Sequence, residues 1–267
     1  MEYYSTINGS ALHISDSKKG KTPILLLHGY LETLYVWEEL SIELEKRDFR
    51  VISIDIPGHG FSSFKEDEDV IDFAAHSVNE LLLSLGLKDV IVVGHSMGGY
   101  VAQKAIKENI SLYKGLIMIN SNTLADDAQK KSERDREIAV IEEGKLLTLA
   151  TVSLPKICST GNLRKFDEVI EDLISACELH DPQGIIAAIK GMTNRDDYTA
   201  YLAGNVLPAL FIFGEEDPIF PLEYAQWIQK HIPDATYHFV KNSAHLSFIE
   251  QKEEVLDKMT EWIESLS

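Results

Sequence analysis

Short apolar runs recur along this chain, and this recurrence restricts the fold more than any other feature. Continuous apolar stretches of four or five residues are typical of strands buried on both faces of a parallel sheet. They occur at residues 24–27, 51–54, 90–93, 116–119 and 209–213, and residues 237–240 form a further candidate strand. Helical periodicity fills most of the segments between them. Because the strands alternate with helices, we predict an α/β fold with a mostly parallel, doubly wound sheet.

The first residues of the chain follow a different pattern. Residues 3–7 and 10–14 are strand-like and are separated only by Asn8 and Gly9. Asn-Gly between two strands favours a type I′ turn, because both turn residues need a positive φ. We therefore predict an N-terminal antiparallel hairpin.

The alternation of strands and helices fails between residues 122 and 205. This stretch is charged, contains no convincing strand, and has the apolar periodicity of several amphipathic helices, one of which starts at Asp181 and Pro182. An insertion of this length favours a helical cap (lid) over a loop. We predict a core formed by residues 1–121 and 206–267, with a helical cap at residues 122–205. Arg195 near the end of the cap could touch substrate, but a charged turn is the simpler interpretation.

Composition restricts the partners. The 267 residues carry a formal net charge of −18, which argues against nucleic acid and anionic membranes, since both attract clustered Lys and Arg. No apolar run is long enough to span a bilayer, and the first residues lack a signal-peptide pattern, so we expect a cytoplasmic protein.

Cys158 and Cys177 are expected to be free thiols. No cluster has the spacing of metal ligands, and no organic cofactor is implied. The sequence does not indicate an oligomeric state.

One of the predicted strands runs directly into a glycine-rich turn that contains a serine. Residues 94–99 read Gly-His-Ser-Met-Gly-Gly, and a helical pattern follows. A strand-to-helix reversal this tight strains its central residue and requires small residues two positions before and two positions after it. The strain exposes the hydroxyl of Ser96 at a helix N-terminus, which predicts a nucleophile. The alternative is a glycine-rich turn with an incidental serine.

Two segments resemble phosphate-binding motifs without matching them. Ser96 stands where a dinucleotide-binding loop needs its second glycine. Gly20, Lys21 and Thr22 resemble the end of a P-loop, but Ser15 replaces the first glycine of that motif, and a strand follows where a helix is required.

A serine nucleophile needs a general base, and the base needs a carboxylate that orients it. His245 follows the last predicted strand, whose end opens onto the same edge of the sheet as Ser96. Among the other histidines, His28 and those in helices and linkers are expected to have structural or surface roles. Asp217 is the predicted acid because it follows the strand at 209–213, although Glu215 or Glu216 could replace it. The chain order Ser96, Asp217, His245 is the order expected for this arrangement.

An acyl-transfer site also needs donors for the oxyanion. One comes from the residue after the nucleophile and the other from the loop after an earlier strand. The backbone N–H groups of Met97 and Tyr30 occupy these positions, and Gly29 would let the backbone approach the substrate closely.

With these residues in place, the chain resembles the α/β-hydrolase superfamily over nearly its whole length. The matching segments are residues 28–30, 55–60, 94–99, 214–218 and 243–245. The resemblance is greatest to the small capped branch that includes carboxylesterases, monoacylglycerol lipases and C–C hydrolases. It implies that residues 55–60 shape the site without taking part in the chemistry, and that Trp37 packs in the core. Ala244 departs from the glycine that is common before the histidine, and Ser96 excludes the branches that use an aspartate nucleophile.

The sequence therefore predicts a serine hydrolase that cleaves a small to medium, hydrophobic ester through an acyl-enzyme. The partner is a small-molecule substrate. C–C bond hydrolysis, cofactor-free perhydrolysis and ligand binding by a receptor of the same fold remain alternatives, because the site and not the fold sets the reaction.

Overall fold

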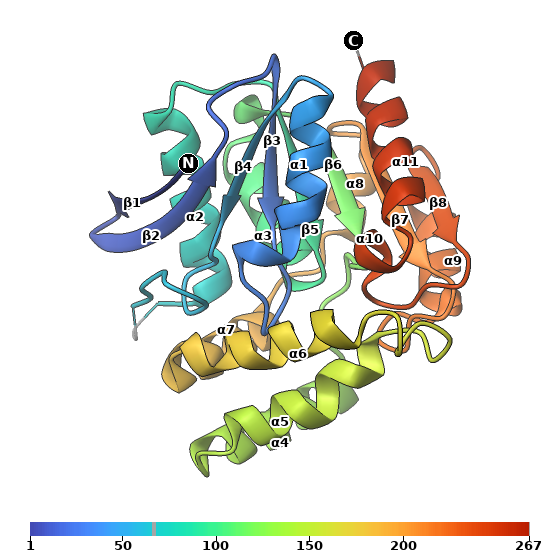
Figure 1. Cartoon of the computed structure of the whole chain (residues 1–267). Coiled ribbons are helices and arrows are strands. Elements are labelled where there is room, and N and C mark those ends of the chain that lie inside the picture. Colours follow the sequence, from blue (N-terminus) through green and yellow to red (C-terminus); the bar gives the residue numbers. More distant parts are fainter. Residues whose placement is uncertain (66–67, 267) are drawn as a thin grey trace.

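The computed structural model describes residues 1–65 and 68–266, and its centre is one eight-stranded sheet (Figure 1). The strand order is β1-β2-β4-β3-β5-β6-β7-β8. The strands are β1 (Glu2–Ile7), β2 (Ser10–Asp16), β3 (Thr22–Leu27), β4 (Phe49–Ile54), β5 (Val90–His95), β6 (Tyr113–Ile119), β7 (Ala209–Gly214) and β8 (Thr236–Val240). From β4 to β8 all neighbouring strands pair in parallel. This confirms the predicted α/β fold.

The N-terminal hairpin has the predicted geometry. β1 pairs antiparallel with β2, and β2 pairs antiparallel with β4, so the hairpin extends one edge of the parallel sheet. Asn8 and Gly9 both have positive φ values, 52° and 78°, as a type I′ turn requires.

Helices cover both faces of the sheet. α2 (Val70–Ser84) packs against α3 (Met97–Glu108) on one face, and α1 (Glu38–Lys46) packs against α11 (Lys252–Ser265) on the other. Asp69 caps α2 by accepting hydrogen bonds from the amides of the first turn. The remaining helical elements of this part are η1 (Leu34–Trp37), η2 (Ile110–Leu112), α9 (Leu222–His231) and α10 (Ser247–Glu250).

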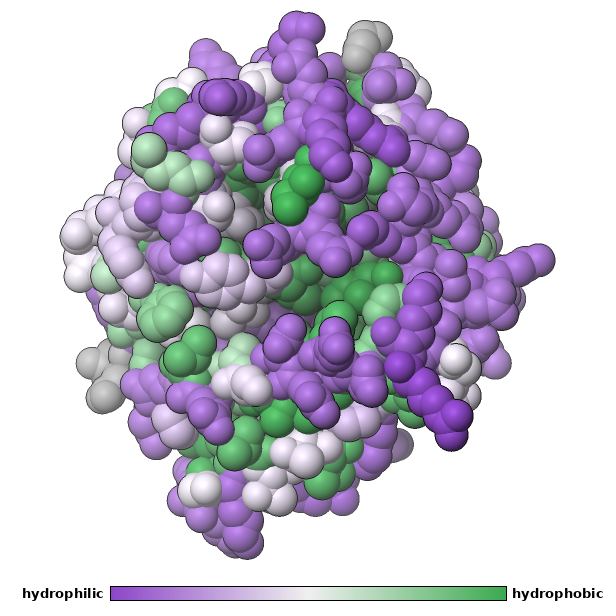
Figure 2. Space-filling view, in the orientation of Figure 1, coloured by the Kyte–Doolittle hydropathy of each residue, from purple (hydrophilic) through white to green (hydrophobic). Residues whose placement is uncertain are grey.

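A helical insertion separates β6 from β7. It contains α4 (Ala128–Glu142), α5 (Leu146–Ser153), η3 (Leu154–Ile157), α6 (Asp167–Ala176), η4 (Cys177–Leu179), α7 (Pro182–Asn194) and α8 (Thr199–Ala203). Asp181 caps α7 and Pro182 occupies its first turn, as the sequence predicts. Helices α4 to α7 lie together below the sheet in Figure 1. Figure 2 shows that most of this face of the molecule is hydrophilic, with apolar surface gathered over these helices.

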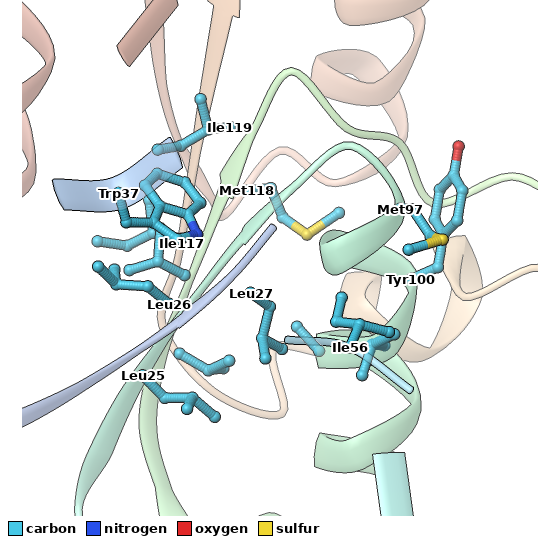
Figure 3. Close-up of a cluster of buried hydrophobic side chains, with 14 of the residues drawn as sticks. Leu25, Leu26, Leu27, Trp37, Ile56, Met97, Tyr100, Ile117, Met118 and Ile119 are labelled. Carbon is cyan, nitrogen blue, oxygen red and sulfur yellow. The ribbon is translucent and has the colours of Figure 1, made fainter. Parts of the chain in front are cut away.

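Apolar side chains from the strands and the first turn of α3 form the core beside the Ser96 turn. Leu25, Leu26 and Leu27 of β3 pack with residues 117–119 of β6 (Figure 3). Trp37 is completely buried and its ring packs at a tilt against Phe248, with ring centres 4.3 Å apart, as expected for a packing residue. Cys158 and Cys177 are buried free thiols. None of the helices in the described residues is long and apolar enough to span a bilayer.

Candidate active site

The turn that carries Ser96 joins β5 to α3 and has the strained geometry that the sequence predicts. Ser96 has φ 49° and ψ −116°, a conformation that a residue with a side chain rarely adopts. The chain passes so close to itself that a Cβ at Gly94 would lie 2.5 Å from the Cα of Gly99, and a Cβ at Gly98 would lie 2.1 Å from the carbonyl oxygen of Leu27. Only glycine fits at positions 94 and 98, so the two glycines allow the turn that presents Ser96.

Asp217 and His245 lie at the ends of β7 and β8 and are hydrogen-bonded to each other. His245 Nδ1 lies 2.8 Å from Asp217 Oδ2, and both residues are buried. The other oxygen of Asp217 accepts the backbone N–H groups of Ile219 and Phe220, at 2.7 and 3.1 Å. Burial raises the pKa of Asp217, but His245 and the hydrogen bonds outweigh burial and hold this pKa below its usual value. Asp217 is therefore an ionised partner for His245.

The neighbouring carboxylates do not contact His245. Glu215 is exposed, and Glu216 accepts a hydrogen bond from the hydroxyl of Ser159 at 2.5 Å. Of the three candidate acids after β7, Asp217 is the one that the fold pairs with His245.

Ser96, His245 and Tyr30 line one cavity of about 550 Å³. The opposite wall comes from the helical insertion and combines apolar residues with charged ones. The apolar residues are Leu124, Leu149, Leu154, Ile157 and Met192, and the arginines are Arg134 and Arg195. Among the described residues, no group of three or more His, Cys, Asp or Glu side chains could hold a metal ion.

Comparison with known proteins fits this geometry. Residues 22–252 match the family model of the alpha/beta hydrolase fold. The chain belongs to this family. The match begins at β3 and ends at the first residue of α11, so it spans the Ser96 turn, Asp217, His245 and the helical insertion.

Relatives of this hydrolase cover almost its full length. It is 27% identical over 266 residues to an AB hydrolase superfamily protein, YisY, from Bacillus subtilis, with 95% of each chain covered. It is 23% identical to a pimeloyl-[acyl-carrier protein] methyl ester esterase from Vibrio vulnificus, over 88% of this chain and 92% of the relative. The structure of a thermophilic esterase from Thermogutta terrifontis, with malate bound, superimposes with a TM-score of 0.91 and 28% identity, covering 100% and 99% of the two chains.

Asn120 is a residue of the site that the sequence analysis missed. It follows β6 with φ 44°, and its Nδ2 donates to Asp217 Oδ2 at 2.8 Å and to the carbonyl oxygen of Ala244 at 3.1 Å. Its Oδ1 accepts the hydroxyl of Ser247 at 2.5 Å. Asn120 thus connects the Asp217 loop to the His245 loop of the hydrolase. The signal in the sequence that could have identified Asn120 is its position directly after the apolar run at residues 116–119.

A second connection runs through His95. This histidine donates from Nε2 to the carbonyl oxygen of His245 at 3.0 Å, and its Nδ1 lies 3.0 Å from Glu32 Oε2. The same carboxylate oxygen accepts the Gly29 amide at 2.6 Å. Burial raises the pKa of Glu32, but His95 and the hydrogen bond from the Gly29 amide outweigh burial and lower this pKa below its usual value. The loop that precedes Tyr30 and the loop of His245 are therefore joined by buried polar groups.

Two backbone donors near Ser96 are free, one in the loop after β3 and one at the start of α3. In the described part of the chain, neither the Tyr30 nor the Met97 amide has an acceptor. His28 supports this loop, since its Nδ1 donates to the Gly29 carbonyl (2.7 Å) and its Nε2 accepts the Ile56 amide (2.9 Å). This is the structural role predicted for His28.

The structure corrects one interpretation of the helical insertion. The simpler interpretation of Arg195 is a charged turn, but its side chain is only 4% exposed and lines the cavity. Its guanidinium lies 3.9 Å from the ring centre of Tyr100 and pairs with Asp126 at 2.6 Å. The interpretation fails because this pairing and stacking stabilise the arginine away from solvent.

Proposed function

We propose that this α/β hydrolase is a serine esterase that cleaves small to medium, mainly apolar carboxylic esters through an acyl-enzyme. One observation carries the proposal: a serine in a strained strand-to-helix turn lines the same cavity as a buried histidine that is hydrogen-bonded to an ionised aspartate. In the proposed roles Ser96 is the nucleophile, His245 is the general base and Asp217 orients the base.

The reaction has two steps. His245 takes the proton of the Ser96 hydroxyl as the oxygen attacks the ester carbonyl, and the resulting imidazolium then protonates the leaving alcohol. In the second step His245 activates water, which hydrolyses the acyl-enzyme and releases the acid. Asp217 fixes the tautomer that leaves the His245 Nε2 free to accept a proton, because Nδ1 donates to the carboxylate.

The free amides of Tyr30 and Met97 are the proposed oxyanion hole. Tyr30 lines the cavity, and Met97 directly follows Ser96 as the first residue of α3, where the helix dipole favours negative charge. Two N–H groups that have no acceptor among the described residues are suited to an oxyanion that exists only during the reaction.

We further propose that residues 122–205 act as a cap over the core formed by residues 1–121 and 206–267. The helices of this segment supply the apolar wall of the cavity. The volume of the cavity suits a small-molecule substrate. Several of the similar proteins are esterases, including the two described above, which supports ester hydrolysis.

The experiment that tests the proposal compares hydrolysis of 4-nitrophenyl butyrate by the wild type, Ser96→Ala and Ser132→Ala. Ser132 is exposed on α4 and does not line the cavity, which makes it a matched control. Ser96→Ala is expected to lower kcat by about 10⁶-fold, whereas Ser132→Ala keeps wild-type activity. Retained turnover in Ser96→Ala would overturn the assignment. A wild type that turns over no ester but binds small ligands would favour the receptor alternative.

A further inference from the structure

Arg134 stands out among the residues of the cavity because it is charged and almost fully buried. It belongs to α4 in the helical insertion, is 6% exposed and lines the cavity together with Ser96. A buried cation in a substrate cavity is costly unless it is paired, so its partners matter.

The protein supplies only part of that pairing. Arg134 Nε donates to Asp126 Oδ2, and the other oxygen of Asp126 accepts Arg195 Nη1 at 2.6 Å. Both oxygens of the one buried carboxylate are thus engaged by two arginines. In the described part of the chain, Nε is the one nitrogen of Arg134 with an acceptor, so the two terminal nitrogens of its guanidinium are left for a ligand.

Two further polar groups that line the cavity are donors. The hydroxyl of Tyr30 and the Nε of Arg195 are buried, and neither has an acceptor among the described residues. Burial raises the pKa of Tyr30 well above its usual value, and the neighbouring Glu137 raises it further, so the hydroxyl keeps its proton. Glu137 also lines the cavity, and burial raises the pKa of its carboxyl group.

The remaining acidic residues of the cavity are engaged elsewhere. Glu133 accepts hydrogen bonds from Lys130 at 3.2 Å and from Gln129 at 3.3 Å, near the exposed rim. Asp127 caps α4 by accepting the Lys130 amide at 2.7 Å. The cavity therefore presents donors of Arg134, Arg195 and Tyr30 that have no acceptor among the described residues.

We propose that Arg134 binds a free carboxylate on the substrate, so that the natural substrates are short esters that carry a carboxylate in addition to the ester bond. This inference rests on the proposed esterase function and narrows its substrate class. A planar guanidinium with two free terminal nitrogens matches the two oxygens of a carboxylate, which a neutral acyl chain cannot supply. The apolar residues around Arg134 would contact the short chain between the carboxylate and the ester.

The test uses two pairs of substrates that differ by the charge. The mono-4-nitrophenyl ester of glutaric acid is compared with 4-nitrophenyl valerate, which places the carboxylate on the acyl side. The butyrate ester of 4-hydroxybenzoate is compared with 4-methylphenyl butyrate, which places it on the alcohol side. In at least one of the two pairs, kcat/KM of the wild type is expected to be about 10- to 100-fold higher for the charged ester than for the neutral one.

Arg134→Gln should remove this preference by lowering kcat/KM more for the charged ester than for the neutral one. Arg136→Gln is the matched control, since Arg136 is exposed on the same helix and does not line the cavity, and it should keep the preference. The absence of a preference in both pairs, or an equal loss for charged and neutral esters in Arg134→Gln, would overturn the inference. If Arg134→Gln does not fold, Arg134→Lys keeps the charge beside Asp126 without the planar fork; an unchanged preference in that variant would be equally contradictory.

A binding measurement separates this inference from the proposed function. Glutarate is titrated calorimetrically into Ser96→Ala and into the double variant Ser96→Ala with Arg134→Gln. Binding by the first and at least tenfold weaker binding by the second support the carboxylate site even if no ester is turned over. Equal binding, or none by either variant, overturns it, while loss of ester turnover in Ser96→Ala bears on the nucleophile alone.

Discussion

The two walls of the cavity differ in which elements supply their residues and in how those residues are held in place. The wall of the core carries Ser96, Asp217 and His245 at the ends of parallel strands, and their loops are connected through Asn120 and His95. The insertion-side wall presents side chains from four separate helical elements, with Asp126 holding two arginines. In the proposed function the core wall serves the chemistry, whereas the insertion wall sets which molecules fit. Damage to the first should affect all substrates, and damage to the second should change their ranking.

The largest expected effect is on the core wall. Asp217→Asn removes the charge that orients His245 and permits the wrong tautomer, so kcat should fall by about 10⁴-fold for every ester. The steady-state rate of 4-nitrophenyl butyrate hydrolysis measures this. Glu215→Gln alters the exposed neighbour and should leave the rate unchanged. The opposite outcome, with Glu215 essential and Asp217 dispensable, would refute the assignment of the acid.

The next largest effect is expected at Glu32, which joins His95 to the Gly29 amide. Glu32→Ala leaves His95 and the Gly29 amide without their buried acceptor, so the free energy of unfolding should fall by about 3–5 kcal/mol. Urea denaturation measures the change. Glu45→Ala, at an exposed site on α1, should stay within about 0.5 kcal/mol of the wild type. A fully stable Glu32→Ala would show that these loops do not depend on the carboxylate.

The contact between the insertion and the core should respond to pH. His180 belongs to the insertion and accepts the Gly60 amide at 3.0 Å, and burial lowers its pKa from 6.5 to about 4. The unfolded chain therefore takes up this proton first, so stability is highest above pH 6.5 and declines as pH falls toward 4. The decline attributable to His180 at pH 5 is about 2 kcal/mol.

Urea unfolding of the wild type and His180→Asn at pH 7 and pH 5 isolates this contribution. The asparagine can still accept from Gly60 but does not titrate, so the variant should lose about 2 kcal/mol less than the wild type between the two pH values. His231→Asn removes an exposed histidine and should behave like the wild type. Equal losses in all three proteins would contradict the predicted role of His180.

The smallest expected effect is on the insertion wall. Leu149→Ala enlarges the cavity, so the ratio of kcat/KM for 4-nitrophenyl octanoate over the butyrate should rise by about tenfold. Leu147→Ala, at an exposed site on the same helix, should leave the ratio unchanged. If the two variants give the same ratio, Leu149 does not contact the acyl chain.

The comparison of the two walls also explains what the sequence could predict. The Ser96 turn was predictable because its two glycines stand at fixed distances from the serine, and any other residue there would collide with the backbone. The sheet was predictable because buried parallel strands have continuous apolar sequences. Asp217 and His245 could be placed at the same sheet edge for the same reason. The fold brings His245 Nδ1 to 2.8 Å from Asp217 Oδ2.

The remaining features depend on contacts between distant segments. Asn120 and Glu32 are single polar residues with no characteristic spacing, and their importance comes from partners 63 to 124 residues away, outside the reach of a local pattern in the sequence. Arg134 and Arg195 lie in charged stretches that are typical of solvent-exposed surface. Only the packing of the helical insertion, with Asp126 shared between them, buries these arginines in the cavity.

The most direct test of the central claim is to locate the reactive residue by chemistry. The wild type is treated with a fluorophosphonate at stoichiometric concentration and digested, and the modified peptide is sequenced by mass spectrometry. A single adduct on Ser96, formed much more slowly in His245→Ala, is the predicted result. An adduct on a different residue, or ester turnover that continues after Ser96 has been fully modified, would contradict the account.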